Sequence, residues 1–317
     1  MTALPAYLEP LDHGVYAIDT GFQRPRFDAA YLLVHEGRAA FIDCGTNHAV
    51  PRLLASLQAV GLSTADVDYV IPTHVHLDHA GGAGALMQHL PQATLIVHPR
   101  GARHMVDPSA LYQGALAVYG QAEMERSYGA LVPVAAERVQ ASHDGMTLEL
   151  AGRPLLLLDT PGHARHHHCV WDETSGGWFT GDTFGLSYRE FDTARGAWVL
   201  PTSTPVQFEP DALRQSVLRL LAMRPEWMYL THYGRVGDVR RLAHTLLDQV
   251  DAMVLLAQAL RDAPRRHEQL KQGLMTLYTD RLHHHGVDDD ARIAELLAMD
   301  VELNAQGLGV WLDRQAA

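Results

Sequence analysis

The chain has 317 residues, of which 47% are hydrophobic and 20% are charged, and its formal net charge at pH 7 is −12. This composition is ordinary for a soluble globular protein, and the length suits one large domain or two smaller ones. The negative charge disfavours a nucleic-acid-binding protein, because binding to a phosphate backbone needs a basic surface. Cys44 and Cys169 are the only cysteines, so a disulfide framework is not expected.

The N-terminal sequence has no basic segment followed by an apolar one, as a signal peptide would have. Nowhere does the chain contain 18 consecutive apolar residues, the length that predicts a transmembrane helix. We therefore expect a cytoplasmic protein that acts on a small molecule and has neither a nucleic acid nor a membrane as its partner.

Strand and helix signals alternate along the first hundred residues. Apolar runs in residues 14–21, 29–37 and 38–46 predict strands, and hydrophobic residues at helical spacing in residues 48–61 predict a helix. A further strand, a helix and a strand are expected between residues 67 and 98. Residues 100–130 break this alternation with helical pieces, which form either a crossover or a lid over a pocket.

Strand signals return between residues 146 and 232, with one helix from about residue 211 to 223. Two β-rich halves, each followed by helices, predict an α/β fold in which sheets lie between layers of helices. After Asp238 the pattern predicts three helices, at residues 238–263, 264–285 and 288–314. We expect a catalytic domain at residues 1–237 and a helical part at residues 238–317, which packs on the sandwich or forms a homodimer.

The segment THVHLDHAGG, residues 73–82, contains three His and one Asp within six residues. His74 and His76 are two residues apart on an extended segment, so their side chains point the same way and can bind one cation. Asp78 and His79 lie where the chain turns into a helix and could bind a second cation beside the first. Imidazole and carboxylate groups are suitable ligands for zinc, iron or manganese.

Three more polar residues follow apolar strand runs further along the chain. His163 ends the stretch DTPGH, Asp182 lies in FTGDT and His232 lies in YLTHYG. We expect all three at strand ends, where sheet proteins commonly gather their sites. With the first motif they make five His and two Asp, which is enough for two metal ions that share one carboxylate.

This ordered set resembles the metallo-β-lactamase superfamily, whose pattern is His-x-His-x-Asp-His followed by a distant His, Asp and His. The resemblance covers roughly residues 10–235 and implies an αββα sandwich, here with a helical C-terminal extension. It is strongest for the glyoxalase II-like and lactonase-like branch, in which Asp takes the bridging position. The resemblance implies the following ligands: His74, His76 and His163 for the first ion, Asp78, His79 and His232 for the second, and Asp182 as the bridge.

Other side chains are candidates for supporting roles. Asp43, in FIDCG, lies where the family carries an Asp that supports a ligating His, with turn capping as the alternative. His167 is expected to support a ligand in the same way. Tyr233 either packs or donates a hydrogen bond to an oxyanion. Phe184 and Tyr188 either form the wall of a substrate pocket or pack within their loop.

The resemblance implies a dinuclear hydrolase with two divalent metal ions, most readily Zn²⁺, with Fe or Mn as alternatives. Such ions hold a bridging hydroxide and lower the pKa of bound water toward roughly 7. Asp78 could orient this hydroxide, and the substrate is expected to be a small ester, thioester or lactone. Two alternatives remain open: an oxidoreductase like the persulfide dioxygenases, which use a single iron, and a regulatory member of the fold that only binds a ligand.

Overall fold

A computed structural model describes residues 4–203 and 205–316, and the chain divides into two compact units. Unit 1 consists of Met1–Asp159, His166–Gly181 and Pro225–Arg235, and unit 2 consists of Thr160–Arg165, Asp182–Arg224 and Val236–Ala317. Each unit is assembled from separate stretches of sequence. The domain boundary expected near residue 238 stays a prediction, because compactness does not show which stretches fold independently.

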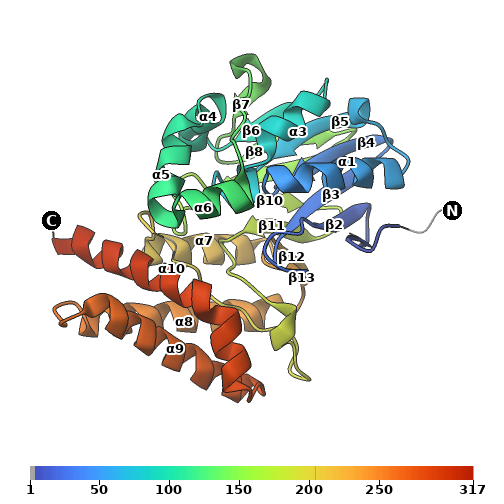
Figure 1. Ribbon diagram of the computed structural model, residues 1–317. Helices are drawn as coiled ribbons and strands as arrows, with labels where there is room; N and C mark the ends of the chain where they lie inside the picture. Colours follow the sequence, from blue (N-terminus) through green and yellow to red (C-terminus); the bar gives the residue numbers. More distant parts are fainter. Residues whose placement is uncertain (1–3, 204, 317) are drawn as a thin grey trace. The chain divides into compact units, whose positions relative to one another are not determined.

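Two β-sheets lie in the described part of unit 1, except that the last residue of β13 belongs to unit 2 (Figure 1). The first sheet runs in the order β1 (Leu8–Pro10), β2 (Val15–Asp19), β3 (Ala29–His35), β4 (Arg38–Ile42), β5 (Val67–Ile71), β6 (Thr94–Val97) and β7 (Val139–Ala141). Its strands pair antiparallel from β1 to β4 and parallel from β4 to β7. The second sheet runs in the order β13 (Gly234–Val236), β12 (Trp227–Leu230), β11 (Gly177–Gly181), β10 (His168–Asp172), β9 (Arg153–Asp159) and β8 (Met146–Leu150).

The burial of these strands follows from their sequences. The central strands β3, β4, β10 and β11 are apolar and buried along most of their length, as expected where both faces of a sheet are covered. The edge strand β8 alternates between buried and exposed residues, because one of its faces meets water. One core, which includes Tyr31, Ile71, Leu157 and Phe179, joins residues of both sheets.

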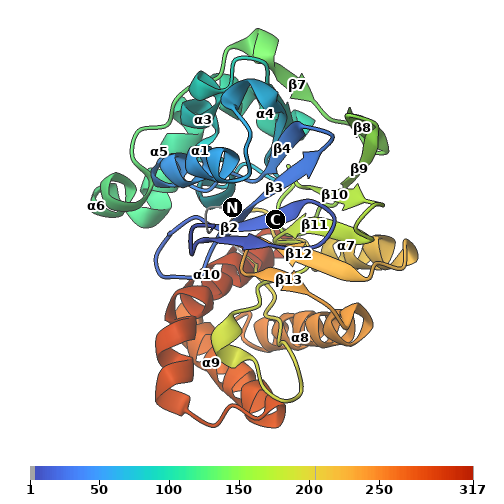
Figure 2. The ribbon, with the colours of Figure 1, turned by 90° about the vertical axis from the view of Figure 1, so that its right-hand side faces the viewer.

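A second core lies between the first sheet and the helices of unit 1 (Figure 2). It joins Phe41 and Val70 of the sheet to Leu53 of α1, Leu86 of α3 and Met105 of α4. The helical segments of this unit are α1 (Val50–Ala59), α2 (Leu77–Ala80), α3 (Ala83–His89), α4 (Pro99–Val106), α5 (Ser109–Tyr119) and α6 (Gln121–Glu123), with short 3₁₀ turns at Asn47–Ala49, Thr64–Asp66 and Ala136–Arg138 and a π-helical turn at Met124–Tyr128. The expected helical pieces in residues 100–130 are thus confirmed, whereas their action as a lid stays a prediction.

Unit 2 is mainly helical. Its helices are α7 (Pro210–Ala222), α8 (Val239–Ala259), α9 (Arg266–His285) and α10 (Asp290–Ala316), with a 3₁₀ turn at Arg189–Phe191. These bounds confirm the three predicted C-terminal helices to within a few residues. The helical spacing of hydrophobic residues predicted α8 because this helix buries one stripe of them, which includes Leu242, Leu246 and Val250.

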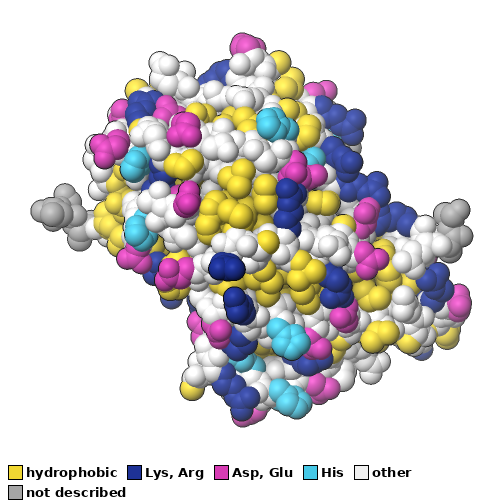
Figure 3. Space-filling view, turned by 180° about the vertical axis from the view of Figure 1, so that it is seen from behind, with side chains coloured by type: hydrophobic (Ala, Val, Ile, Leu, Met, Phe, Trp, Pro, Cys, Tyr) yellow, Lys and Arg dark blue, Asp and Glu magenta, His cyan; other side chains and the backbone are white. Residues whose placement is uncertain are grey.

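The surface carries charges of both signs. On the face shown in Figure 3, basic, acidic and hydrophobic side chains are interspersed. Several of the charges form exposed ion pairs, such as Arg281 with Asp248 and Arg292 with Glu295. None of the helices among the described residues combines the length and the hydrophobicity that crossing a bilayer requires.

Candidate metal centre

The His-rich segment begins where β5 ends and is held by both sheets of unit 1. The backbone N–H of Thr73 donates to Asp43 Oδ1, which follows β4, at 2.7 Å. The carbonyl oxygen of Thr73 accepts from the N–H of His168, the first residue of β10, at 2.9 Å. The chain then turns into α2, which carries Asp78 and His79. Contacts from two sheets therefore fix the backbone on which four candidate ligands stand.

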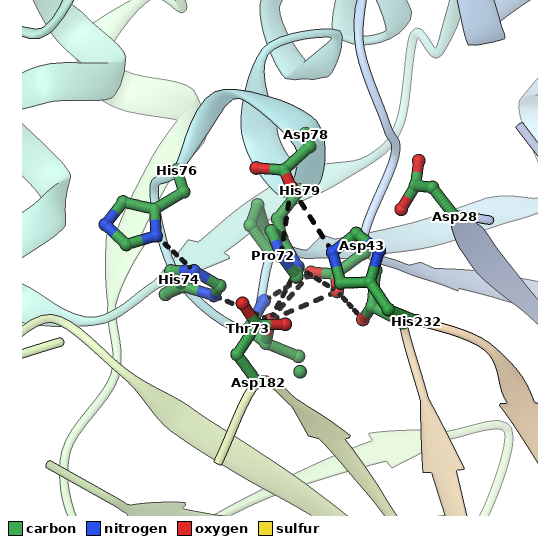
Figure 4. Close-up of polar contacts among 12 residues, drawn as sticks. Asp28, Asp43, Pro72, Thr73, His74, His76, Asp78, His79, Asp182 and His232 are labelled. Atoms are coloured by element: carbon green, nitrogen blue, oxygen red, sulfur yellow. Dashed lines mark hydrogen bonds and ion pairs between the residues drawn. The ribbon is translucent and has the colours of Figure 1, made fainter. Parts of the chain in front are cut away.

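Asp78, His79 and His232 form a compact group at this position (Figure 4). One ligand atom from each residue lies within 4.8 Å of the others. The Oδ2 atom of Asp78 is 3.8 Å from His79 Nε2 and 3.3 Å from His232 Nε2. A carboxylate and two imidazoles are a donor set that suits divalent zinc, iron or manganese. The residues expected for the second ion are thus brought together by unit 1 alone.

Hydrogen bonds orient both imidazoles of this group. His79 Nδ1 lies 2.8 Å from Asp43 Oδ2, and His232 Nδ1 lies 2.9 Å from the carbonyl oxygen of Phe27. Because both partners are acceptors, the proton of each ring belongs on Nδ1. Each Nε2 then presents a lone pair toward Asp78, which is the arrangement that metal-ligating histidines need.

Asp43 is the centre of a buried hydrogen-bond network. Besides the Thr73 N–H and His79, its carboxylate accepts from the Thr73 hydroxyl, with distances of 3.0 Å and 3.1 Å to its two oxygens, and from the Thr231 hydroxyl at 2.7 Å. The structure therefore places Asp43 in contact with a candidate ligand and with the segments that precede His74 and His232. This contact supports the predicted role, although Asp43 also stabilises the turn after β4.

Replacing Asp43 with asparagine is expected to weaken metal binding by about 10- to 100-fold, the usual effect of removing a ligand's hydrogen-bond partner. The amide keeps only one acceptor oxygen, so either His79 and Thr231 lose the acceptor at Oδ2 or the Thr73 N–H loses the acceptor at Oδ1. Competition with a chelating dye measures the affinity. Asp68→Asn, at a partly exposed position on β5, is the matched control. An Asp43→Asn affinity equal to that of the unchanged protein would contradict the role.

His74 and His76 also face each other. His74 Nε2 is 2.8 Å from His76 Nδ1, so two ring nitrogens converge as expected for ligands of one ion. The ring of His167 stacks on that of His74 with centroids 4.8 Å apart, which places His167 beside a candidate ligand. His166 also lies against this segment, since its Nδ1 accepts from the Val75 N–H at 3.4 Å.

His163 and Asp182 lie together within unit 2. His163 Nε2 is 3.4 Å from Asp182 Oδ2, and both residues are buried. The loop before His163 is anchored to α7, where the Ser216 hydroxyl donates to the Pro161 carbonyl oxygen at 2.6 Å. Gly162 adopts φ +135°, and a Cβ there would lie 2.3 Å from the Leu213 backbone. Only glycine fits this position, so Gly162 is required for the loop that presents His163.

Asp28 is a site residue that sequence reasoning missed. It directly precedes β3 and is fully buried. Burial raises its pKa to about 7, an effect that His232 and His79 oppose and Asp78 reinforces. Figure 4 shows its carboxylate on the His232 side of the group. The available signal was an Asp in the otherwise apolar run FDAAYLLV, where a charged side chain is unusual.

The structure places the three predicted aromatic candidates in packed surroundings. Tyr233 is buried in the core between the two sheets, with the Arg26 guanidinium 5.3 Å from its ring centroid. Phe184 is fully buried, and the Tyr188 hydroxyl donates to Asp300, 3.0 Å and 3.2 Å from its two carboxylate oxygens. These surroundings favour the packing alternative for all three, and a role in substrate contact stays a prediction.

A family model described as the metallo-beta-lactamase superfamily matches residues 23–232. The chain belongs to this superfamily. The fold class expected from the sequence, an αββα sandwich with a helical C-terminal extension, is thereby confirmed, as is the resemblance on which it rested.

Individual relatives support this placement. The metallo-beta-lactamase fold-containing protein ST1585 of Sulfurisphaera tokodaii is 26% identical over 230 residues, which are 71% of this chain and 80% of that protein. Its solved structure aligns with a TM-score of 0.67 and covers 94% of this chain and 99% of that one. A metallo-beta-lactamase family protein of Thermus thermophilus aligns with a TM-score of 0.68 at 22% identity and covers 96% and 94% of the two chains.

A relative with a named activity matches a smaller part of the chain. The hydroxyacylglutathione hydrolase of Salmonella typhi is 30% identical over 162 residues, which are 50% of this chain. The match spans 49% of that enzyme, so this chain corresponds to about half of its length.

Proposed function

We propose that this protein is a metal-dependent hydrolase with a dinuclear centre that acts on a small ester, thioester or lactone. The observation that carries the proposal is the group of Asp78, His79 and His232, with both imidazoles oriented by acceptors on Nδ1. Membership of the metallo-beta-lactamase superfamily and the likeness to hydroxyacylglutathione hydrolases support hydrolysis as the reaction.

Chain connectivity limits how far two candidate ligands of unit 2, Asp182 and His163, lie from the residues of unit 1 that are next to them in sequence. Gly181, which directly precedes Asp182, lies against Thr73 and His167: a Cβ on it would be 2.4 Å and 2.7 Å from their side chains. Consecutive Cα atoms are about 3.8 Å apart, so Asp182 cannot be far from this position. His163 is three residues from His166, which limits the separation of their Cα atoms to about 11 Å.

In this proposal His74, His76 and His163 would hold one ion, Asp78, His79 and His232 would hold the other, and Asp182 would be the ligand that they share. When bound, two divalent metal ions, most readily zinc, would activate water and polarise the substrate carbonyl. The chain's own groups position the chemistry. Asp43 holds His79, the Phe27 carbonyl oxygen holds His232, and Asp78 is placed to orient the attacking group.

A hydrolysis panel tests the proposal. The protein is treated with a chelator, reconstituted separately with Zn²⁺, Mn²⁺ or Fe²⁺, and offered matched thioesters, aryl esters and lactones. We expect turnover of at least one class with metal and its loss in His232→Ala, but not in His143→Ala at an exposed position. No turnover of any acyl substrate with any ion would overturn the hydrolase assignment. Oxygen consumption with a persulfide and a single bound iron would instead identify the oxidoreductase alternative.

A further inference from the structure

Only one of the two carboxylate oxygens of Asp28 has a hydrogen-bond partner among the described residues. Its Oδ2 accepts from the Thr20 hydroxyl at 2.5 Å. Its Oδ1 is buried and has no hydrogen-bond partner among residues 4–203 and 205–316. Leaving a buried carboxylate oxygen unsatisfied is costly. A purely structural role, as the acceptor for Thr20, explains one oxygen and not the other.

Backbone hydrogen bonds hold the segment that carries Asp28 against the segments at Thr20 and Thr231. The carbonyl oxygen of Asp28 accepts from the Thr20 N–H at 3.0 Å, and the N–H of Ala29 donates to the Thr231 carbonyl oxygen at 2.8 Å. On the other side, Phe27 packs its ring 5.3 Å from the ring of His232 and accepts its Nδ1–H. Residues on both sides of Asp28 are thus bound to Thr231 and His232.

Three charged groups that interact with Asp28 belong to one cluster. His232, Asp78 and His79, the three members of the compact group described above, interact electrostatically with its carboxylate. The ligand atoms of those three residues lie within 4.8 Å of one another, and Asp28 is not a member of that group. Its position is therefore beside the candidate ligands rather than among them.

We propose that Asp28 is a further acidic member of the metal site at Asp78, His79 and His232, where its carboxylate increases the affinity for a cation and presents Oδ1 as a hydrogen-bond acceptor. A negative charge held in a buried place lowers the free energy of a nearby cation more than an exposed one would. The inference rests on the proposed metal centre, and it assigns a residue to that centre that the ligand pattern does not contain.

Metal titration of four variants tests this assignment. Asp28→Asn keeps the shape of the side chain and an acceptor for Thr20 but removes the charge. Asp28→Ser is a second, smaller replacement that also keeps a partner for Thr20. Thr20→Val removes the hydrogen bond and leaves the carboxylate in place, and Asp78→Ala removes a candidate ligand. Binding of Zn²⁺ and Co²⁺ is followed by calorimetry and by the Co²⁺ absorption spectrum, with thermal unfolding in chelator as the check on folding.

We expect two ions per chain in the unchanged protein and a 10- to 100-fold loss of affinity for one of them in Asp28→Asn and Asp28→Ser, the range for residues beside the ligands. Thr20→Val should change that affinity by less than about threefold. An unaltered affinity in the folded Asp28 variants, or an equal loss in Thr20→Val, would overturn the inference and leave the proposed function standing. If the unchanged protein binds no metal, the proposed function itself fails.

Discussion

Replacing Asp182 with alanine is expected to lower kcat/KM for hydrolysis by at least about a hundredfold, since even residues beside metal ligands contribute 10- to 100-fold. Asp182 is the candidate bridge, and its Oδ2 lies 3.4 Å from His163 Nε2. Without its carboxylate the two ions lose their shared ligand, and His163 loses its neighbouring negative charge. Steady-state kinetics after reconstitution with Zn²⁺, together with metal content, measures both effects.

Glu190→Ala is the matched control for Asp182→Ala, because it removes one negative charge from an exposed position eight residues further along the same unit. It should change kcat/KM by less than about twofold, as surface substitutions away from a site usually have small effects. Unchanged activity and unchanged metal content in Asp182→Ala would refute the assignment of Asp182 as a bridge.

Replacing Asp172 with alanine is expected to lower the free energy of unfolding by about 3–5 kcal/mol, the cost of removing one partner from a buried ion pair. Asp172 on β10 and Arg153 on β9 are both fully buried, and Arg153 Nε donates to Asp172 Oδ1 at 2.8 Å. Arg153 also donates to the His13 carbonyl oxygen at 2.7 Å. The variant leaves a buried guanidinium without its counter-charge.

Chemical denaturation followed by far-UV circular dichroism measures this effect. Glu295→Ala removes one partner of the exposed pair with Arg292 and should cost less than about 1 kcal/mol. The double variant Arg153→Met with Asp172→Leu should recover much of the lost stability, because apolar residues of similar volume can replace a buried pair. A loss below about 1 kcal/mol for Asp172→Ala would show that Arg153 finds another partner.

Much of the architecture was predictable because it depends on local periodicity. The stripe of α8 and the apolar runs of the central strands repeat with the spacing of their own backbone, so each element could be recognised from neighbouring residues. The His-rich segment was predictable for a similar reason. Its four polar side chains are close in sequence, and the turn from β5 into α2 sets their directions.

The features that sequence reasoning missed or left open depend on contacts between distant residues. Asp28 lies beside His232, 204 positions away in the sequence, only because β3 and the end of β12 pack in one unit. Tyr188 packs because its hydroxyl meets Asp300, 112 residues further along. No local pattern distinguishes a tyrosine that meets a distant carboxylate from one that faces a substrate.

Elemental analysis of protein purified without chelator tests the dinuclear centre most directly. The proposal predicts two divalent ions per chain in the unchanged protein and about one in His232→Ala, with two retained in the exposed control His143→Ala. Fewer than one tightly bound ion per chain in the unchanged protein, after reconstitution with zinc, iron or manganese, would contradict it.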